Sequence, residues 1–370
     1  MSGASDTPAP DADQAPPAGV LAAWGLAGCA VERVAGGLIN ATFLVHRPGG
    51  DPLVLQRLHP IFAAEVNLDI EAITDHLAAA GLVTPLLVRT DGGARWVIEG
   101  ERAVWRALTY VDGVTLHEVP DAEHALAAGE LVGRFHRALS GHEREFAFQR
   151  AGVHDTAAHL GRLAGAVRRG AGDAVDPGDA DAVARVAEAT QLGREILDAG
   201  ARLPPLGELP RRPVHGDLKI SNILFARGVT PPSAICLIDL DTLGRQSVAY
   251  EMGDALRSWC NPAGEDTIDT RFDLDVFDAA MRGYAAGLDG LLGPAEVASL
   301  VSGLEIVCVE LAARFCVDAF EDRYFGWDPA RFSSRRHHNL VRARGQLRLG
   351  RAVAGARAEA DRRVTAAFAS

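Results

Sequence analysis

Residues 214–225 read VHGDLKISNILF, and this stretch contains Lys219, the only lysine in a chain of 370 residues. The other basic side chains, out of 37 lysines and arginines together, are all arginine. The excess of alanine, glycine and arginine is typical of GC-rich coding, so a lysine kept here indicates a position that needs an ammonium group. An ammonium is a compact point charge with three donors, which the planar arginine fork does not reproduce.

Two carboxylates and an amide follow one another at fixed spacing in and after this stretch. Asp217 comes first, Asn222 follows five residues later, and Asp239 follows after another seventeen, at the end of the apolar run ICLIDLD. A single hairpin would bring all three side chains to one end of a pair of strands. The sequence therefore places two acids and an amide where they can act on one ligand.

Phosphoryl transfer needs groups of this kind, because its transition state is stabilised mainly by positioning and by charge neutralisation. One carboxylate orients the acceptor hydroxyl, while a second carboxylate and a neutral oxygen suit Mg²⁺, which prefers hard oxygen ligands. Lys219, two residues after Asp217, is a candidate for the cation that offsets the charge of the transferring group. HGD alone is a weak signal, but HGDLKxSN followed by a strand ending in DxD is far more specific.

HGDxxxxN followed by IDxD resembles the aminoglycoside phosphotransferase/choline kinase superfamily, over about residues 30–350. The resemblance implies the α+β class and a protein-kinase-like two-lobe fold, with a small antiparallel-sheet N-lobe and a larger, mainly helical C-lobe. It implies ATP and Mg²⁺ as cofactors, with Asp217 as the catalytic base and Asn222 and Asp239 as the metal ligands. Asp254, in YEMGDALRS, matches an aspartate that braces this loop from a following helix.

Within the superfamily, five segments are similar to N-acetylhexosamine 1-kinases: GGLINATFLV, LVLQRLHPIF, ICLIDLDTLG, MGDALRS and ELAARFCVDAFEDRYF. This resemblance implies that the chain phosphorylates the anomeric hydroxyl of an N-acetylhexosamine. It also implies that Arg314 and Tyr324 contact the sugar, although their spacing is one residue shorter than in the family pattern. The arginines at 314 and 323 favour a neutral or acylated sugar.

Two other functions stay open. A kinase of the same fold could act on an aminoglycoside, an amino alcohol or another sugar hydroxyl. A catalytically inactive nucleotide-binding protein is also conceivable, but such a protein would be expected to lack one of the three landmarks, and all three are present.

The segment VAGGLINATFLV resembles the glycine-bearing strand–turn–strand that covers ATP phosphates, which implies nucleotide contacts at Gly36, Gly37, Asn40 and Thr42. A plain hairpin turn would have the same sequence pattern. The segment is not a Walker A loop, because that motif requires a lysine after its glycine.

The other nucleotide contacts are expected in the strand, helix and hinge that follow. Arg57, in LVLQRLH, is the expected basic side chain near the phosphates, and Glu71 is its expected helix partner. An exposed strand arginine is the alternative. Tyr110 and Val111, in ALTYVDG, are the expected hinge residues beside adenine. His136, in LVGRFHRAL, is interpreted as a packed core histidine and not as a catalytic group.

Composition and charge favour a cytoplasmic enzyme of small molecules. The formal net charge of −12 disfavours nucleic acid and anionic membranes as partners. None of the five cysteines forms a CxxC pair, which indicates reduced thiols. No uninterrupted apolar run reaches about 18 residues, so we expect no membrane span. A monomer is the default expectation.

The chain is expected to divide into a disordered tail (1–19), a nucleotide-binding lobe (20–108) and a catalytic and substrate-binding lobe (109–370), with a ligand cleft between the lobes. The pattern predicts three antiparallel strands over 31–59, a helix over 63–80 and two further strands up to 111. It then predicts helices over 121–140, 154–170 and 181–199, short strands over 213–241, and helical stretches over 275–311 and 334–365.

Overall fold

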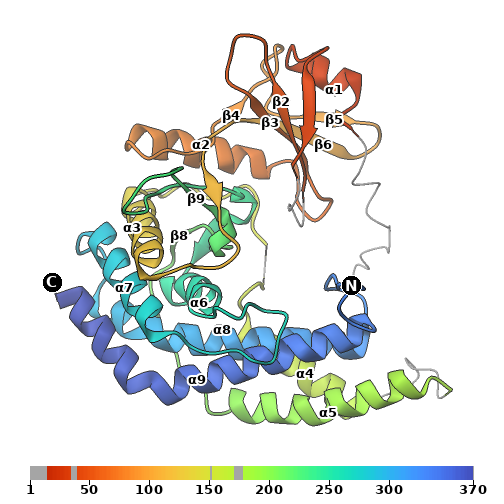
Figure 1. Cartoon of the computed structure of the whole chain (residues 1–370), viewed down its shortest axis with the longest axis vertical. Coiled ribbons are helices and arrows are strands. Elements are labelled where there is room, and N and C mark those ends of the chain that lie inside the picture. The colour runs from red at the N-terminus through yellow and green to blue at the C-terminus, as the bar shows by residue number, and fades with distance from the viewer. Residues whose placement is uncertain (1–14, 35–39, 151, 171–177, 370) are drawn as a thin grey trace. The chain divides into compact units, whose positions relative to one another are not determined.

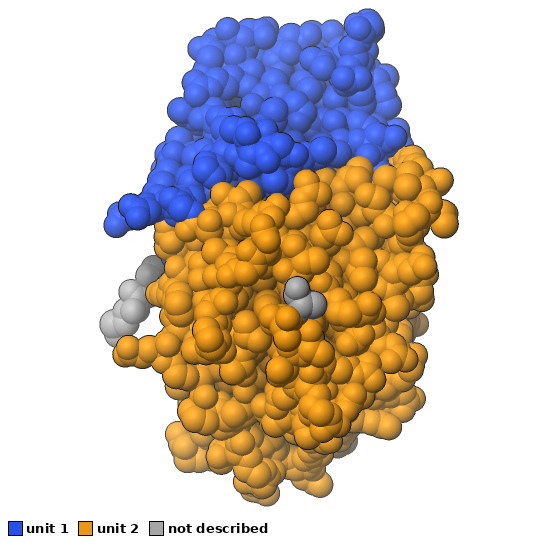
Figure 2. Space-filling view, turned by 90° about the vertical axis from the view of Figure 1, so that its left-hand side faces the viewer, with its two compact units in different colours: residues 1–113, 141–149, 236–244 blue, residues 114–140, 150–235, 245–370 orange. Residues whose placement is uncertain are grey.

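The computed structural model describes residues 15–34, 40–150, 152–170 and 178–369. The chain divides into two compact units, shown in two colours in Figure 2. Unit 1 comprises residues 1–113, 141–149 and 236–244, and unit 2 comprises residues 114–140, 150–235 and 245–370. Gly36 and Gly37, which the sequence predicts as nucleotide contacts, lie outside the described residues.

Unit 1 is built on one antiparallel sheet (red and orange in Figure 1). Its strands are β1 (Ala30–Arg33), β2 (Ala41–His46), β3 (Leu53–Arg57), β4 (Leu87–Val88), β5 (Val97–Glu99) and β6 (Ala103–Thr109). Their order is β1-β2-β3-β6-β4, with β5 paired to β6. The three strands predicted over 31–59 are confirmed. Of the two further strands predicted up to 111, the second is wrong as a single strand, because Gly100 adopts a φ of 61° and turns the chain between β5 and β6.

The two faces of this sheet differ in polarity. Along β3, Leu53 and Leu55 are buried on one face, in a cluster that includes Trp24 after helix α1 (Ala18–Ala23). The opposite face carries Gln56 and, on the neighbouring strand, Arg106. Arg106 hydrogen-bonds Asn67 on helix α2 (Val66–Ala79), so α2 lies on the polar face. The helix predicted over 63–80 is confirmed.

Unit 2 is mainly helical. Its helices are α3 (Ala122–Ala138), α4 (Thr156–Arg169), α5 (Ala180–Gly200), α6 (Val248–Trp259), α7 (Leu274–Leu288), α8 (Pro294–Glu321) and α9 (Arg335–Ala369). Four of them, α3, α4, α5 and α7, begin at an aspartate whose carboxylate accepts a backbone N–H of the first turn. The helical stretch predicted over 275–311 is two helices, because Asp289 and Gly290 take left-handed conformations and end α7.

Short strands of unit 2 carry the segment with the HGD motif. They are β7 (Val114–Thr115), β8 (Arg212–Val214) and β9 (Ile223–Phe225), and β7 pairs antiparallel with β9. The chain enters unit 1 within β10 (Ala234–Leu237) and leaves it at the start of β11 (Gly244–Gln246). The two long helices α8 and α9 pack along each other (blue in Figure 1). Within the described residues, none of the helices has the length and apolar character needed to cross a bilayer.

Glycines let α3 and α7 approach closely. A Cβ atom on Gly283 of α7 would lie 2.0 Å from the backbone oxygen of Leu126 on α3, and one on Gly129 would lie 2.2 Å from the oxygen of Ala280. This close approach places Tyr284 and His136, both buried, side by side with their polar atoms 2.8 Å apart. The glycines therefore hold a buried polar pair at a defined separation.

We predict that Gly283→Ala lowers the free energy of unfolding by about 2 to 3 kcal/mol, because the new methyl group overlaps backbone that cannot move aside. Denaturant unfolding measures this. Gly161→Ala on α4 is the matched control, since a Cβ atom there meets nothing within 4 Å. The control is expected to be neutral or slightly stabilising. Equal midpoints for Gly283→Ala and the wild type would contradict the close-packed interface.

Candidate active site

The HGD motif forms a tight loop in unit 2. β8 leads into the loop, Gly216 turns it with a φ of 83°, and the short 3₁₀ helix η2 (Ile220–Asn222) leads into β9. A positive φ of this size favours glycine, which explains the glycine before Asp217. The reversal brings Asn222 back onto Asp217, five residues earlier in the chain.

Asp217, Lys219 and Asn222 contact one another. Lys219 Nζ lies 2.9 Å from Asp217 Oδ2, and Asn222 Nδ2 donates to the same Oδ2 at 3.0 Å and to the Asp217 backbone oxygen at 2.8 Å. Both partners of the amide nitrogen are acceptors, so the assignment of nitrogen and oxygen in Asn222 is fixed by chemistry. Its amide oxygen is not the atom that binds Asp217, and it is a hard oxygen ligand of the kind that Mg²⁺ prefers.

Helix α6 holds this loop at two points. Glu251 accepts the backbone N–H of His215 with Oε1 at 2.8 Å and that of Gly216 with Oε2 at 3.0 Å. Trp259, at the other end of α6, donates its indole N–H to the Leu218 backbone oxygen at 2.8 Å. Both backbone amides before Asp217 and the carbonyl after it are therefore fixed by buried side chains.

The sequence analysis predicted that Asp254 braces the HGD loop, and this prediction is wrong. Asp254 accepts hydrogen bonds from Arg257 Nε and Nη2, its neighbour one turn later on α6, while Glu251 takes the loop amides. The reason is local geometry: residues three apart on a helix lie side by side and pair with each other. Glu251, one turn earlier, is the residue that reaches the loop.

Buried neighbours of Glu251 favour its ionised form. Glu251 is 3% exposed, and His136 Nε2 lies 3.6 Å from its Oε1. Burial, the largest influence, would raise the pKa of Glu251, but the His136 ring, His215 and the donated backbone N–H together lower it. His136 Nδ1 pairs with the Tyr284 hydroxyl at 2.8 Å. The interpretation of His136 as a packed core histidine is confirmed, and its contact explains why it is there.

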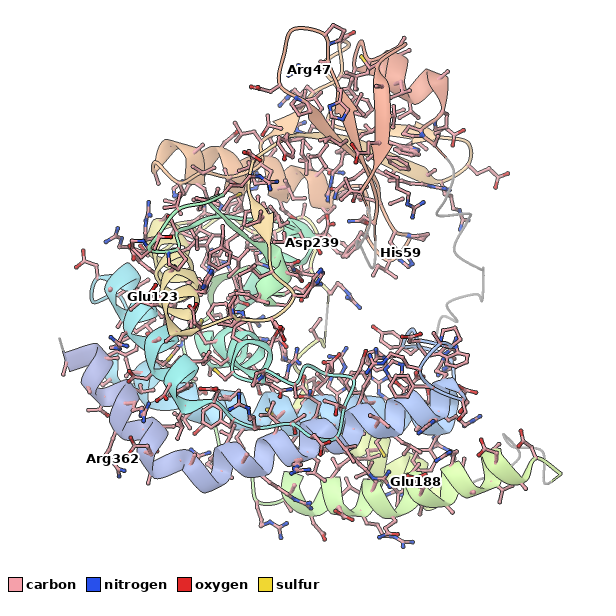
Figure 3. All side chains as sticks on the ribbon, viewed as in Figure 1. Arg47, His59, Glu123, Glu188, Asp239 and Arg362 are labelled. Atoms are coloured by element: carbon pink, nitrogen blue, oxygen red, sulfur yellow. The ribbon has the colours of Figure 1, made fainter. Side chains whose placement is uncertain are left out.

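Asp239 belongs to unit 1 and precedes the 3₁₀ helix η3 (Leu240–Thr242); it is labelled in Figure 3. Its backbone has φ 65° and ψ 54°, a left-handed conformation that is uncommon for a residue with a side chain. Asp217 and Asn222 belong to unit 2, so a metal site shared by all three side chains stays a prediction.

The predicted nucleotide contacts have other partners within unit 1. Asn40 donates to Asp241 Oδ2 and accepts the backbone N–H of His59, so its amide has a partner on both sides and its contact with a nucleotide stays a prediction. Thr42 Oγ1 accepts a hydrogen bond from Gln56. Tyr110 and Val111 follow β6, where the Tyr110 hydroxyl lies 3.3 Å from Asp112 Oδ1. Their hinge role stays a prediction.

The predicted pairing of Arg57 with Glu71 is also wrong. Glu71 is bound by Arg89 at 2.9 Å and by Arg95 at 2.5 Å. Along β3, side chains alternate between faces, so Arg57 shares the face of the buried Leu55. The face toward α2 belongs to Arg106, which the sequence analysis did not single out.

Unit 2 contains a cavity of about 230 Å³ lined by both predicted substrate residues, Arg314 and Tyr324. Its lining also includes three further arginines, Arg150, Arg162 and Arg323. The Tyr324 hydroxyl lies 3.3 Å from Arg150 Nη2. Burial, the largest influence, would raise the pKa of Tyr324, but the arginines at 150 and 314 lower it below its usual value.

Asp318 shapes the loop that carries Tyr324 at this cavity. Its carboxylate accepts the backbone N–H groups of Arg323, Tyr324 and Phe325 and also a hydrogen bond from Asn339. With its oxygens used in this way, Asp318 acts as a structural anchor. The cavity's remaining carboxylate, Glu321, is paired with Arg323 at 2.8 Å, so the other arginines dominate the charge of the lining.

A buried histidine–carboxylate pair was missed by the sequence analysis. His154 Nδ1 lies 3.0 Å from Glu310 Oε1, and Thr156 donates to Glu310 Oε2 at 2.7 Å. Tyr250 stacks on the His154 ring with centroids 5.2 Å apart. The signal was available, because Glu310 stands in the apolar helical run EIVCVELAARF and a buried carboxylate there needs a partner.

The comparisons with known proteins agree with this geometry. The family model described as "Phosphotransferase enzyme family" matches residues 30–287. A curated relative named homoserine kinase, from Gluconacetobacter diazotrophicus, is 29% identical over 268 residues, which are 71% of this chain and 72% of the relative. The resemblance predicted at the level of the superfamily is confirmed, whereas the finer likeness to N-acetylhexosamine 1-kinases stays a prediction.

Solved structures show the same fold at low sequence identity. A microcompartment-associated aminopropanol kinase has a TM-score of 0.62 and 17% identity, with 94% of this chain and 98% of that chain covered. Amicoumacin kinase hAmiN, solved with AMP-PNP, Ca²⁺ and its ligand Ami, has a TM-score of 0.56 and 16% identity, with 86% and 87% covered. The predicted fold class, with a sheet-built and a mainly helical part, is confirmed.

We predict that Glu251→Gln lowers turnover by about ten- to a hundredfold, as is usual when a residue that orients a functional group is changed. The amide presents an N–H to one of the two loop N–H groups and cannot accept from both. Nucleotide affinity should change less than twofold, because the nucleotide contacts are predicted in unit 1 and Glu251 belongs to unit 2. Steady-state kinetics with nucleotide titration measures both. Glu265→Gln, which loses a pair with the same helix through Arg257, is the control, and equal turnover in the two variants would contradict the brace.

The His154–Glu310 pair predicts a pH-dependent stability. Burial, the largest influence, opposes protonation of His154, yet the hydrogen bond and charge of Glu310 raise its pKa above the usual 6.5. A raised folded pKa stabilises the protein fully below the unfolded pKa and loses this contribution as the pH rises through the folded pKa. The difference in unfolding free energy between wild type and His154→Asn should therefore be larger at pH 6 than at pH 9. Denaturant unfolding at both values tests this, and a difference that grows with pH would contradict it.

Proposed function

Since the chain belongs to the phosphotransferase enzyme family, we propose that it transfers the γ-phosphoryl group of ATP to a hydroxyl of a sugar, with the anomeric hydroxyl of an N-acetylhexosamine as the first candidate. The observation that carries the phosphoryl-transfer part is the Asp217 carboxylate, held by Lys219 and Asn222 on a loop whose amides are fixed by Glu251. The relatives' names also describe kinases of small molecules.

Asp217 orients the acceptor. Its Oδ2 already receives hydrogen bonds from Lys219 and Asn222, so Oδ1 is the oxygen proposed to accept the hydroxyl proton. The acceptor oxygen forms a bond to the γ-phosphorus while the bond from that phosphorus to the bridging oxygen breaks. ADP leaves with that electron pair, and the proton passes to Asp217. The fixed loop keeps the carboxylate in line with the attacking oxygen, which is where most of the rate enhancement in this chemistry originates.

The oxygen donors fit a divalent metal. Asn222 presents its amide oxygen because its nitrogen is used by Asp217, and Asp239 supplies a carboxylate from a fixed backbone conformation. These two residues would hold Mg²⁺, which, when bound, neutralises phosphate charge. The ammonium of Lys219 balances the Asp217 carboxylate at 2.9 Å and adds a positive charge beside the transferring group.

The acceptor is proposed to occupy the cavity lined by Arg314 and Tyr324. Its four arginines face only two lining carboxylates, Asp318 and Glu321, both of which are engaged by their own loop. Such a lining repels polycationic aminoglycosides and suits neutral or anionic oxygen-rich molecules. Arginine donors match acetamido and hydroxyl oxygens, and aromatic rings cover the apolar faces of sugars.

A hydroxy amino acid such as homoserine is the second candidate acceptor. It is favoured by the name of the curated relative and by the arginines of the cavity, which can bind a carboxylate through two parallel hydrogen bonds. Both candidates use the same Asp217 chemistry and differ in what the cavity recognises.

The test is an ATP-consumption screen over N-acetylhexosamines, neutral sugars, homoserine, aminopropanol and kanamycin-type aminoglycosides, with phosphorus NMR of each product. An anomeric phosphate on an N-acetylhexosamine is the expected result. Asp217→Asn is the control and should lose about 10²- to 10⁴-fold in turnover while still binding nucleotide. Turnover of homoserine alone selects the second candidate. Turnover of aminoglycosides alone, or full activity in Asp217→Asn, would overturn the proposal.

A further inference from the structure

The segment that carries Asp239 is anchored two residues later, at Asp241. Asp241 is 1% exposed and receives hydrogen bonds from two residues of the unit 1 sheet region. Arg106 donates Nη1 to Oδ1 at 2.5 Å and Nη2 to Oδ2 at 2.9 Å, and Asn40 donates to Oδ2 at 2.5 Å. The carboxylate is thus gripped by a two-pronged guanidinium and by an amide from a different part of the chain.

Arg106 is itself held on the remaining sides. It lies within β6, is 1% exposed, and donates Nε and Nη2 to Gln56 Oε1 on β3 at 2.9 and 2.7 Å. Its Nη1 also lies 3.4 Å from Asn67 Oδ1 on α2. All three guanidinium nitrogens therefore have partners, and they tie β6, β3, α2 and η3 together.

Asn40 completes the arrangement from the other end. Its Oδ1 accepts the backbone N–H of His59 at 2.9 Å while its Nδ2 donates to Asp241. The position of Asp241 is therefore set by residues whose own hydrogen bonds leave them little freedom. A planar guanidinium that binds both carboxylate oxygens also fixes the orientation of the carboxylate plane, which a single point charge would not do.

Asp239 needs such an anchor. Its left-handed backbone, with φ 65° and ψ 54°, is disfavoured for a residue with a Cβ atom and persists only where the surrounding structure imposes it. One residue, Leu240, separates it from Asp241, and Leu240 is buried. Fixing residues 240 and 241 leaves the backbone at 239 few alternatives, and this backbone sets the direction in which the Asp239 side chain leaves the main chain.

We propose that Arg106 and Asp241 are positioning residues that hold the Asp239 carboxylate in the orientation required to bind a divalent metal ion. The inference rests on the proposed role of Asp239 as a magnesium ligand. Neither residue is assigned any contact with substrate, and their effect acts through the backbone of η3. An apolar pair of similar volume could fill the same space, so the retained ion pair serves orientation more than stability.

The test compares Asp241→Asn and Arg106→Lys with the wild type in the full chain. Asp241→Asn keeps the shape but loses the charge, and Arg106→Lys keeps the charge but loses the fork. Mn²⁺ binding, followed by electron paramagnetic resonance with ADP present, reads the metal site without catalysis. The Mg²⁺ dependence of turnover and the KM of the acceptor are measured for the same variants.

Both variants should weaken Mn²⁺ binding and raise the half-saturating Mg²⁺ concentration by about ten- to a hundredfold, as is typical of residues that orient metal ligands. The KM of the acceptor should stay within about twofold, and high Mg²⁺ should restore much of the turnover. Unchanged metal affinity in folded variants would overturn the inference.

Matched controls separate this effect from a loss of stability. Asp266→Asn and Arg342→Lys make the same two chemical changes in a carboxylate–arginine pair of unit 2, where Asp266 lies 2.6 Å from Arg342 and 2.8 Å from His338. They should leave Mn²⁺ affinity unchanged. An equal loss of affinity in the controls would show that the effect is a general one and would overturn the inference.

Asp239→Asn separates failure of the inference from failure of the proposed function. If that variant binds Mn²⁺ like the wild type, Asp239 is not a metal ligand and the proposed role falls with everything built on it. If it loses Mn²⁺ while Asp241→Asn does not, only the positioning role is wrong. Should both main variants unfold, Asp241→Glu keeps the charge but lengthens the side chain, so it displaces the pair with Arg106; a metal affinity equal to that of the wild type in this variant would then overturn the inference.

Discussion

The arrangement of unit 2 depends on one interaction, the capture of the His215 and Gly216 backbone N–H groups by the buried Glu251 carboxylate. The HGD loop, whose Asp217 is proposed to face the substrate, does not pair these two amides within a helix or a sheet, and unpaired amides in a buried position cost free energy. An ionised carboxylate offers two strong acceptors for two adjacent donors. Its own burial is offset by His136, which Tyr284 orients, and Tyr284 reaches that place only because glycines let α3 and α7 approach. The position of the HGD loop therefore depends, through these contacts, on how closely α3 and α7 pack.

In unit 1 the segment that carries Asp239 is also anchored, but by different groups. There, the segment with Asp239 is held through a side-chain carboxylate, Asp241, and the donors are a guanidinium and an amide. The difference follows from the backbone. In the HGD loop the glycine takes the turn, so the amides before Asp217 can be held directly. At Asp239 a residue with a side chain takes a left-handed conformation, and the constraint is applied two residues later. In both units the group proposed to act lies one or two positions along the chain from the group that is anchored.

Local patterns allowed the sequence to predict much of this, and long-range pairing explains the rest. The first three strands of unit 1, α2 and the HGD loop were predictable because period, turn residues and motif all lie within about ten residues. The brace by Glu251 and the pair of Arg106 with Asp241 join residues 36 and 135 positions apart, which no local pattern encodes. The sequence predicted Arg57 because it stands in the expected strand, and it gave no signal for Arg106. The alternation of β3 already argued against Arg57, since it shares a face with Leu53 and Leu55. The segments 141–149 and 236–244 join unit 1 through tertiary contacts alone.

Lys219, the single lysine of the chain, lies beside the Asp217 carboxylate. Lys219 has an extended backbone, with φ −60° and ψ 151°, and Leu218 beside it is fully buried with its carbonyl bound to Trp259. The ammonium therefore returns along the same side of the chain to Asp217 and takes one oxygen, Oδ2, which it shares with Asn222. An arginine at this position would tend to bind both carboxylate oxygens with its fork, as Arg106 does at Asp241. That arrangement suits an anchor, because it fixes a carboxylate completely. It would not suit the role proposed for Asp217, which needs one carboxylate oxygen for an incoming hydroxyl. The two aspartates are therefore suited by different cations.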